Sequence, residues 1–119
     1  MKIGYSKLLR EMLTNADSFS FVVRDGMGLN ESGKKIIEDL KSHLIEATRS
    51  SEWPGTKLIN HTALVSKYRL NEESIKSLSR VKGLFDWMQP DLPEDLTFYK
   101  NDKPIFASIA HEKDCWYVE

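Results

Sequence analysis

Hydrophobic residues recur every three or four positions at the start of the chain. They are Tyr5, Leu8, Leu9, Met12, Leu13 and Ala16. This spacing places them on one face of an α-helix, opposite charged residues such as Lys7 and Glu11. The pattern predicts an amphipathic helix over about residues 4–15.

From residue 18 the period changes from that of a helix to that of a strand. Phe19, Phe21 and Val23 alternate with Ser18, Ser20 and Val22. Alternation with a period of two indicates a half-buried strand, because successive side chains of a strand point to opposite faces. The pair Asp25-Gly26 then predicts a turn.

A second helix is predicted from the N-cap residue Asn30 to about Thr48, because Glu31 suits the positive end of the helix dipole. Its expected inward residues are Ile36, Ile37, Leu40, Leu44 and Ala47. The sequence Trp53-Pro54-Gly55 predicts a turn, since Pro54 fixes φ and Gly55 accepts a positive φ. Residues 56–70 are rich in β-branched and aromatic types and predict one long strand.

Asn71 is the expected N-cap of a third helix, whose apolar stripe extends to Met88. Gly83 lies inside this stripe and predicts a kink or an early end. Three further strands are expected at residues 96–99, 105–110 and 115–118, joined by turns at Asn101-Asp102 and at residues 111–114.

The predicted order of elements is α-β-α-β-α-β-β-β. We therefore expect an α+β fold in which three helices pack on one face of a largely antiparallel sheet that ends in a three-stranded meander. A chain of 119 residues fits a single globular domain over residues 1–119.

Composition excludes several classes of function. The chain is 40% hydrophobic and 29% charged, which is typical of a folded domain. The net charge of −1 gives no overall attraction for nucleic acid. The apolar runs are far shorter than the roughly 20 residues of a membrane span. The single cysteine, Cys115, fits a reducing compartment, and we expect a cytoplasmic protein with no membrane association.

No motif of high specificity for catalysis or cofactor binding occurs in the chain. It has no P-loop, no GxGxxG sequence and no zinc-ligand spacing, so we expect no cofactor and no metal. The cluster His111, Glu112, Asp114 and Cys115 is interpreted as a polar turn. An enzymatic alternative, a small hydrolase or a metal enzyme, requires His61, His111 and Cys115 to converge in one pocket.

The segment from Leu84 to Tyr99 combines acidic and aromatic residues and contains no Lys or Arg. Together with one upstream tryptophan it supplies the candidate partner-binding residues Trp53, Asp86, Trp87, Asp91, Glu94 and Asp95. Aromatic residues anchor interfaces and a negative field attracts a basic partner. The competing interpretation is that the aromatic residues are core and the acids solvate a loop.

Three stretches, EWPGTKL, LFDWMQPDLPEDLTFYKNDKP and ASIAHEKD, carry a family resemblance that covers about residues 30–114. The chain resembles a family of small uncharacterised bacterial proteins from Bacillus-type organisms. Some members carry a stage III sporulation label, and small domains of this kind also occur as immunity proteins beside polymorphic toxin genes. The resemblance implies no particular functional residues.

Three hypotheses follow. The first is a non-enzymatic binding protein of the immunity type that sequesters a protein toxin, for which a basic toxin is one candidate, through the acidic aromatic segment. The second is the enzyme that uses His61, His111 and Cys115. The third is a sporulation-associated or structural assembly module, which would have an apolar surface for self-association.

Overall fold

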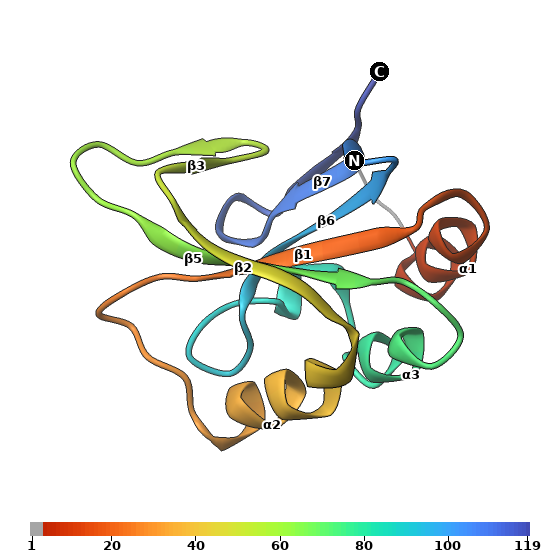
Figure 1. Cartoon of the computed structure of the whole chain (residues 1–119), viewed down its shortest axis with the longest axis horizontal. Coiled ribbons are helices and arrows are strands. Elements are labelled where there is room, and N and C mark those ends of the chain that lie inside the picture. Colours follow the sequence, from red (N-terminus) through yellow and green to blue (C-terminus); the bar gives the residue numbers. More distant parts are fainter. Residues whose placement is uncertain (1–3) are drawn as a thin grey trace.

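The computed structural model describes residues 4–119 and is built around a six-stranded sheet (Figure 1). The strands lie in the order β2-β5-β1-β6-β7-β8, and each neighbouring pair is antiparallel. Their bounds are β1 Ser18–Val23, β2 Leu44–Ser50, β5 Ala63–Arg69, β6 Glu94–Lys100, β7 Lys103–Ile109 and β8 Asp114–Tyr117. The first strand in sequence, β1, therefore lies in the interior of the sheet.

Three helices pack on one face of this sheet (Figure 1). They are α1 (Tyr5–Asn15), α2 (Glu31–Leu40) and α3 (Ser74–Ser79). The main hydrophobic core joins their inward side chains to aromatic residues of the strands. Its largest members include Leu8, Met12, Leu40, Leu78, Phe19, Phe21, Tyr68, Phe98 and Phe106. Alternate residues of the strands thus supply one wall of the core, as the period-two pattern requires.

The opposite face of the sheet is partly covered by a small hairpin of β3 (Glu52–Trp53) and β4 (Thr56–Lys57). Trp53 packs there with Val22 and Ala63 in a second, smaller hydrophobic cluster. Gly55 forms the turn of the hairpin with a φ of +91°. A Cβ atom at this position would lie 2.5 Å from the Trp116 ring, so the hairpin rests closely on the sheet.

Several predictions from the sequence are confirmed. The first helix, the first strand and the C-terminal meander occur where they were expected. Asn30 caps α2 by accepting hydrogen bonds from two backbone N–H groups. Asn101 and Asp102 both have positive φ, at 51° and 65°, as a tight hairpin turn needs.

The second helix was predicted too long. It ends at Leu40, a short 3-10 turn follows at Lys41–His43, and residues predicted to be helical form strand β2. Leu44 and Ala47 are exposed and not inward. Strand β2 lies at the edge of the sheet, and six of its seven residues are exposed. Its sequence therefore has no alternation of buried and exposed residues that would indicate a strand. Its conformation is decided by pairing with β5.

Two other elements also differ from the prediction. The expected strand over residues 56–70 is divided into β4 and β5 by a loop in which Asn60 has a φ of 64°. The third helix ends at Ser79, well before Met88, and Gly83 is extended. The α+β class with three helices is confirmed. The predicted element order is confirmed only in part, because four strands and not one separate α2 from α3.

The radius of gyration is 13.0 Å, close to the roughly 13.5 Å expected for one compact domain of this length. Among the described residues, no helix is both long and apolar enough to cross a membrane.

We predict that Gly55→Ala destabilises the fold more than Gly26→Ala does. Both glycines have a positive φ, which costs another residue about 1–2 kcal/mol. Only Gly55 also lacks room for a Cβ, which adds about 1–3 kcal/mol of overpacking. Urea unfolding of the two variants measures the difference, and equal losses would show that the hairpin does not rest closely on the sheet.

Candidate functional site

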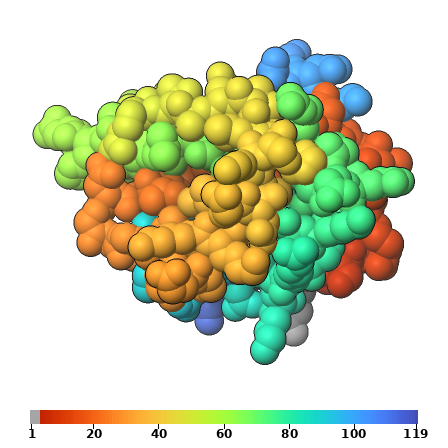
Figure 2. Space-filling view, turned by 60° about the horizontal axis from the view of Figure 1, so that its bottom comes forward, coloured from red at the N-terminus to blue at the C-terminus, as the bar shows by residue number. Residues whose placement is uncertain are grey.

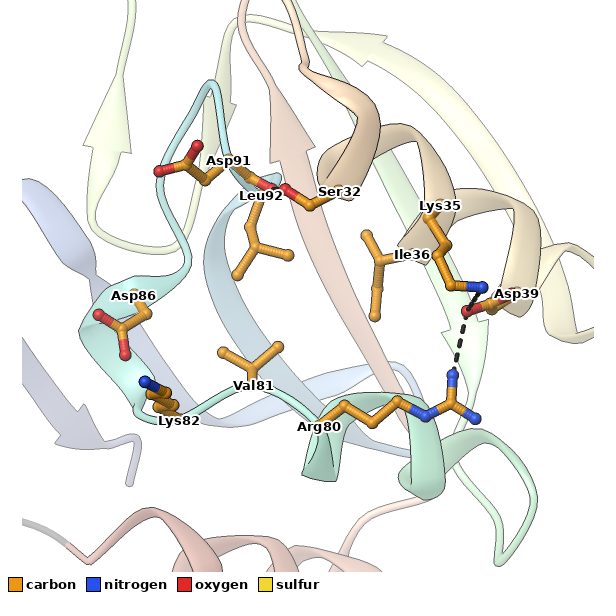
Figure 3. Close-up of a pocket in the computed structure, with 10 residues that line it drawn as sticks. All are labelled: Ser32, Lys35, Ile36, Asp39, Arg80, Val81, Lys82, Asp86, Asp91 and Leu92. Atoms are coloured by element: carbon orange, nitrogen blue, oxygen red, sulfur yellow. Dashed lines mark hydrogen bonds and ion pairs between the residues drawn. The ribbon is translucent and has the colours of Figure 1, made fainter.

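A groove lies between α2 and the segment that follows α3, on the helix side of the molecule. Figure 2 shows these two parts of the chain side by side, α2 in amber and the later segment in teal. The groove has a volume of about 430 Å³. We call it the α2 groove, and its lining residues are Ser32, Lys35, Ile36, Asp39, Arg80, Val81, Lys82, Asp86, Asp91 and Leu92 (Figure 3).

Three apolar side chains, Ile36, Val81 and Leu92, occupy the middle of the α2 groove (Figure 3). At one end Asp39 is paired with two cations, at 3.5 Å from the Lys35 ammonium and 3.1 Å from the Arg80 guanidinium. Asp39 is therefore neutralised, and these three residues together keep one positive charge in excess.

The opposite side of the α2 groove carries Asp86 and Asp91, with Lys82 near Asp86 (Figure 3). Both carboxylates belong to exposed residues, and no ion pair joins either of them to another described residue. Asp91 accepts a hydrogen bond from the Asn30 side chain, and its backbone oxygen accepts one of 2.8 Å from Ser32. The N-terminus of α2 thereby fixes the position of Asp91.

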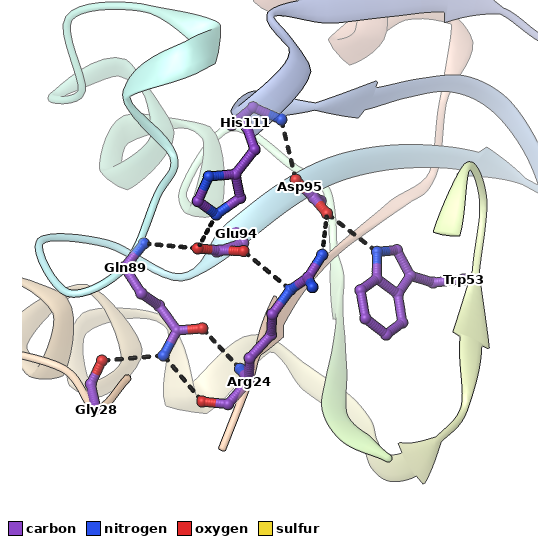
Figure 4. A network of polar contacts seen from close by, with 8 residues as sticks. Arg24, Gly28, Trp53, Gln89, Glu94, Asp95 and His111 are labelled. Carbon is purple, nitrogen blue, oxygen red and sulfur yellow. Dashed lines mark hydrogen bonds and ion pairs between the residues drawn. The ribbon is translucent and has the colours of Figure 1, made fainter. Parts of the chain in front are cut away.

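The chain that leads into this side of the groove is held by Gln89. Its side-chain amide accepts a 2.6 Å hydrogen bond from the backbone N–H of Arg24 and donates to the carbonyl oxygens of Arg24 and Gly28. Its backbone N–H donates to Glu94 at 3.1 Å. Gln89 therefore connects the groove to a group of polar side chains around two buried carboxylates. We call it the polar cluster, and its members are Arg24, Trp53, Gln89, Glu94, Asp95 and His111 (Figure 4).

Glu94 lies at the centre of the polar cluster and is fully buried. The Arg24 Nε atom is 3.1 Å from one of its carboxylate oxygens, and the His111 Nε2 atom is 3.0 Å from the other. Burial of a carboxylate is tolerated only when charged or hydrogen-bonding partners surround it. The Glu94 carboxylate has such partners in Arg24, His111 and the backbone N–H of Gln89.

Asp95 is equally buried and has a φ of +60°, a rare conformation for a residue other than glycine. One carboxylate oxygen accepts a 3.0 Å hydrogen bond from the backbone N–H of Ala110, and the other accepts one of 3.1 Å from the Trp53 indole. Burial raises the pKa of Asp95, whereas these two hydrogen bonds and the Arg24 guanidinium oppose the rise. Asp95 thus fastens the β3–β4 hairpin to the sheet.

Four of the six predicted partner-binding residues are buried, and two are exposed. Trp53, Trp87, Glu94 and Asp95 are buried, so the expected acidic aromatic surface is wrong at these four positions. The sequence shows which residue types stand at these positions, but it does not show which remote residues they contact in the fold. Trp87 for example donates a 3.1 Å hydrogen bond to the hydroxyl of Tyr5 and stacks on Phe21 in the core. Asp86 and Asp91 are exposed in the α2 groove, where partner binding stays a prediction.

The residues of the enzymatic alternative show no common site. His61 is exposed beside a small cavity lined by Arg24, and His111 contacts Glu94. Cys115 is buried on β8, and burial raises the pKa of its thiol. Less of the thiol is then present as the nucleophilic thiolate, so Cys115 is a poorer nucleophile. Within residues 4–119, no group of His, Cys, Asp and Glu is arranged to hold a metal ion.

Two members of the polar cluster, Arg24 and Gln89, were not recognised from the sequence. Arg24 directly follows β1 and Gln89 precedes the Pro90 turn, positions at which exposed polar residues are common. Nothing in either local pattern indicates that Arg24 and Gln89 contact each other across 65 residues of sequence.

Comparison of the chain with protein-family models, curated proteins and solved structures found no match.

We predict that Asp95→Asn destabilises the protein by about 1–3 kcal/mol at neutral pH. Asparagine tolerates a positive φ, but its NH2 group replaces one of the two oxygens that accept from Ala110 and Trp53, so one of these donors then faces another donor. In a Trp53→Phe background the competing indole donor is gone, so the same substitution should cost about 1 kcal/mol less. Urea unfolding of the four proteins gives this coupling, and strictly additive losses would contradict it. Asp86→Asn, at an exposed carboxylate, is the control and should stay within about 0.5 kcal/mol of wild type.

The raised pKa of Asp95 predicts a pH dependence of stability with a defined sign. A folded-state pKa above the ordinary 3.8 means that the folded protein binds the proton more tightly than the unfolded chain. This contribution is fully present below pH 3.8 and is lost as the pH rises through the folded-state pKa.

The free energy of unfolding of wild type minus that of Asp95→Asn should therefore fall as the pH is raised from about 4 and then level off. Chemical unfolding of both proteins at a series of pH values measures this difference, because most other titrating groups cancel. A difference that grows with pH would mean that the protein stabilises the Asp95 carboxylate.

Proposed function

We propose that this chain is a non-catalytic binding protein that holds a protein partner in the α2 groove. The observation that carries the proposal is an apolar floor, Ile36, Val81 and Leu92, that meets two exposed carboxylates, Asp86 and Asp91, on one side. A partner with an apolar side chain and a neighbouring basic group matches both features. The apolar group would fill the floor, and the basic group would meet the carboxylates.

The dimensions of the groove support this use. Ligand sites in proteins measure roughly 300–1,000 Å³ and are lined mainly by apolar groups with a few fixed polar ones, and the α2 groove has about 430 Å³. Its acidic side is also firmly positioned, because Asn30 and Ser32 hold Asp91 and Gln89 anchors the preceding turn. A positioned site costs less conformational entropy on binding than a mobile one.

The class of partner that we propose is a protein toxin with a basic surface, for which this chain acts as an immunity-type protein. Support comes from the acidic side of the groove and from the family resemblance of the sequence. Electrostatic attraction between the partners would speed their encounter, and the apolar floor would slow their separation.

We predict that Asp86→Lys combined with Asp91→Asn weakens capture of the partner by at least about fivefold, equivalent to about 1 kcal/mol. Asparagine at position 91 can still accept the hydrogen bond from Asn30, so α2 keeps its contact. The matched control is Glu72→Lys with Glu112→Gln, which makes the same change in net charge at exposed positions outside the groove.

The measurement is quantitative mass spectrometry of proteins that tagged wild type and variants retain from a lysate of the native organism, followed by calorimetry with the purified partner. A genuine partner is depleted by the groove variant and kept by the control. Lys82→Gln removes the cation near Asp86 and should strengthen binding of a basic partner. The proposal is contradicted if the groove variant and the control variant retain the partner equally. It is also contradicted if Lys82→Gln weakens binding of the partner.

A further inference from the structure

The two ends of the α2 groove carry opposite charge (Figure 3). One end has two cations and one carboxylate, whereas the acidic side has two carboxylates and one cation. The residues are Lys35, Arg80 and Asp39 at the first end, and Asp86, Asp91 and Lys82 on the acidic side. All of them except Asp39 are exposed, so both charges are open to an occupant. We call the first end the cationic end.

Helix α2 sets the direction in which this charge changes. Asp91 lies at the N-terminus of α2, because its carboxylate accepts a hydrogen bond from the N-cap residue Asn30 and its backbone oxygen accepts one of 2.8 Å from Ser32. Asp39 belongs to the last turn of α2, which ends at Leu40. The seven steps from Ser32 to Asp39 rise about 10 Å along the helix axis. The α2 groove is therefore negative beside the start of α2 and positive beside its end.

The apolar floor lies between the two charges (Figure 3). Ile36 of α2 is buried there, and Val81 and Leu92 are half-buried. A helix laid along the groove covers about 10 Å with about eight residues, and its positions i, i+3, i+4 and i+7 share one face. Charged residues at i and i+7 would then meet the two ends, while apolar residues at i+3 and i+4 meet the floor. An extended segment covers the same length in about three steps and turns alternate side chains away, so it brings fewer apolar groups to the floor.

We infer, resting on the proposed function of the groove, that the partner binds with an amphipathic helix that runs antiparallel to α2. This helix has an acidic residue in its first turn and a basic residue in its last turn. The acidic residue then meets Lys35 and Arg80, and the basic residue meets Asp86 and Asp91. Charges placed in this way also stabilise the partner helix through its own dipole. The dipoles of two antiparallel helices attract each other, whereas those of two parallel helices repel.

The test uses stapled helical peptides with alanine at each position x and the staple on the outer face. The first peptide, Glu-x-x-Leu-Leu-x-x-Lys, matches the groove in the antiparallel direction. Its reversal, Lys-x-x-Leu-Leu-x-x-Glu, has the same composition but matches the charges only in the parallel direction, so it should bind more weakly. The neutral peptide Gln-x-x-Leu-Leu-x-x-Gln should bind roughly fivefold more weakly than the first. Fluorescence anisotropy with the full chain measures the three affinities.

A groove variant tests whether the charged residues of the two ends supply this preference. Arg80→Glu with Asp86→Lys exchanges one charge at each end and leaves the net charge unchanged. Because each new charge repels its counterpart, the variant should bind the first peptide at least roughly fivefold more weakly than wild type. The matched control, Lys100→Glu with Glu72→Lys, makes the same exchange at exposed positions outside the groove and should leave the affinity unchanged.

The direction of binding is measured by NMR of the ¹⁵N-labelled full chain with a nitroxide at one end of the first peptide. A nitroxide at the C-terminus should broaden the amide signals of Ser32 and Asp91, and one at the N-terminus should broaden those of Asp39 and Arg80.

The inference is overturned if the first peptide does not bind, or if its reversal or the neutral peptide binds as tightly. It is also overturned if the groove variant binds the first peptide as tightly as wild type, or if the two nitroxides broaden the opposite ends. Capture of the natural partner by the variant Asp86→Lys with Asp91→Asn tests the proposed function separately, so the two can fail independently.

Discussion

The burial of two consecutive carboxylates at the start of β6 is the constraint on which much of this structure depends. Glu94 and Asp95 are both withdrawn from water, and a buried charge is stable only when its partners are in place. Those partners come from separate parts of the chain: Arg24 after β1, Trp53 from the hairpin and His111 from the turn before β8. Segments that are remote in sequence are therefore fixed to one another by polar contacts as well as by the hydrophobic core.

This arrangement positions both the α2 groove and the β3–β4 hairpin. The acidic side of the α2 groove follows Gln89, whose backbone N–H is bound by Glu94. The β3–β4 hairpin contains Trp53, whose indole donates a hydrogen bond to Asp95. The two carboxylates are joined by Arg24, whose guanidinium lies 3.1 Å from Glu94 and 3.8 Å from Asp95. A loss of binding caused by a substitution in the polar cluster should consequently be interpreted first as a structural effect, and only then as the loss of a binding contact.

Sequence patterns were informative wherever an element has one buried face. The stripe of α1 and the alternation of β1 were correctly recognised, and Asn101-Asp102 correctly marked a hairpin. Strand β2 was missed because solvent reaches nearly all of it, so burial leaves no period in its sequence. The polar cluster was missed for a different reason. Whether Asp91 or Asp95 is buried depends on the presence of Arg24 and Trp53 nearby, which is information about the fold and not about the local sequence.

The interior place of β1 has a consequence for how the chain reaches this structure during synthesis. β1 is completed early, yet one of its two neighbours, β6, begins about seventy residues later, and Ser18 pairs with Tyr99. The central pairing of the sheet thus cannot form until most of the chain has been made, and such non-local pairing is slow. Until then Phe19 and Phe21 have no β6 partner to cover them, so the nascent chain exposes these two aromatic side chains for longer than the finished fold would suggest.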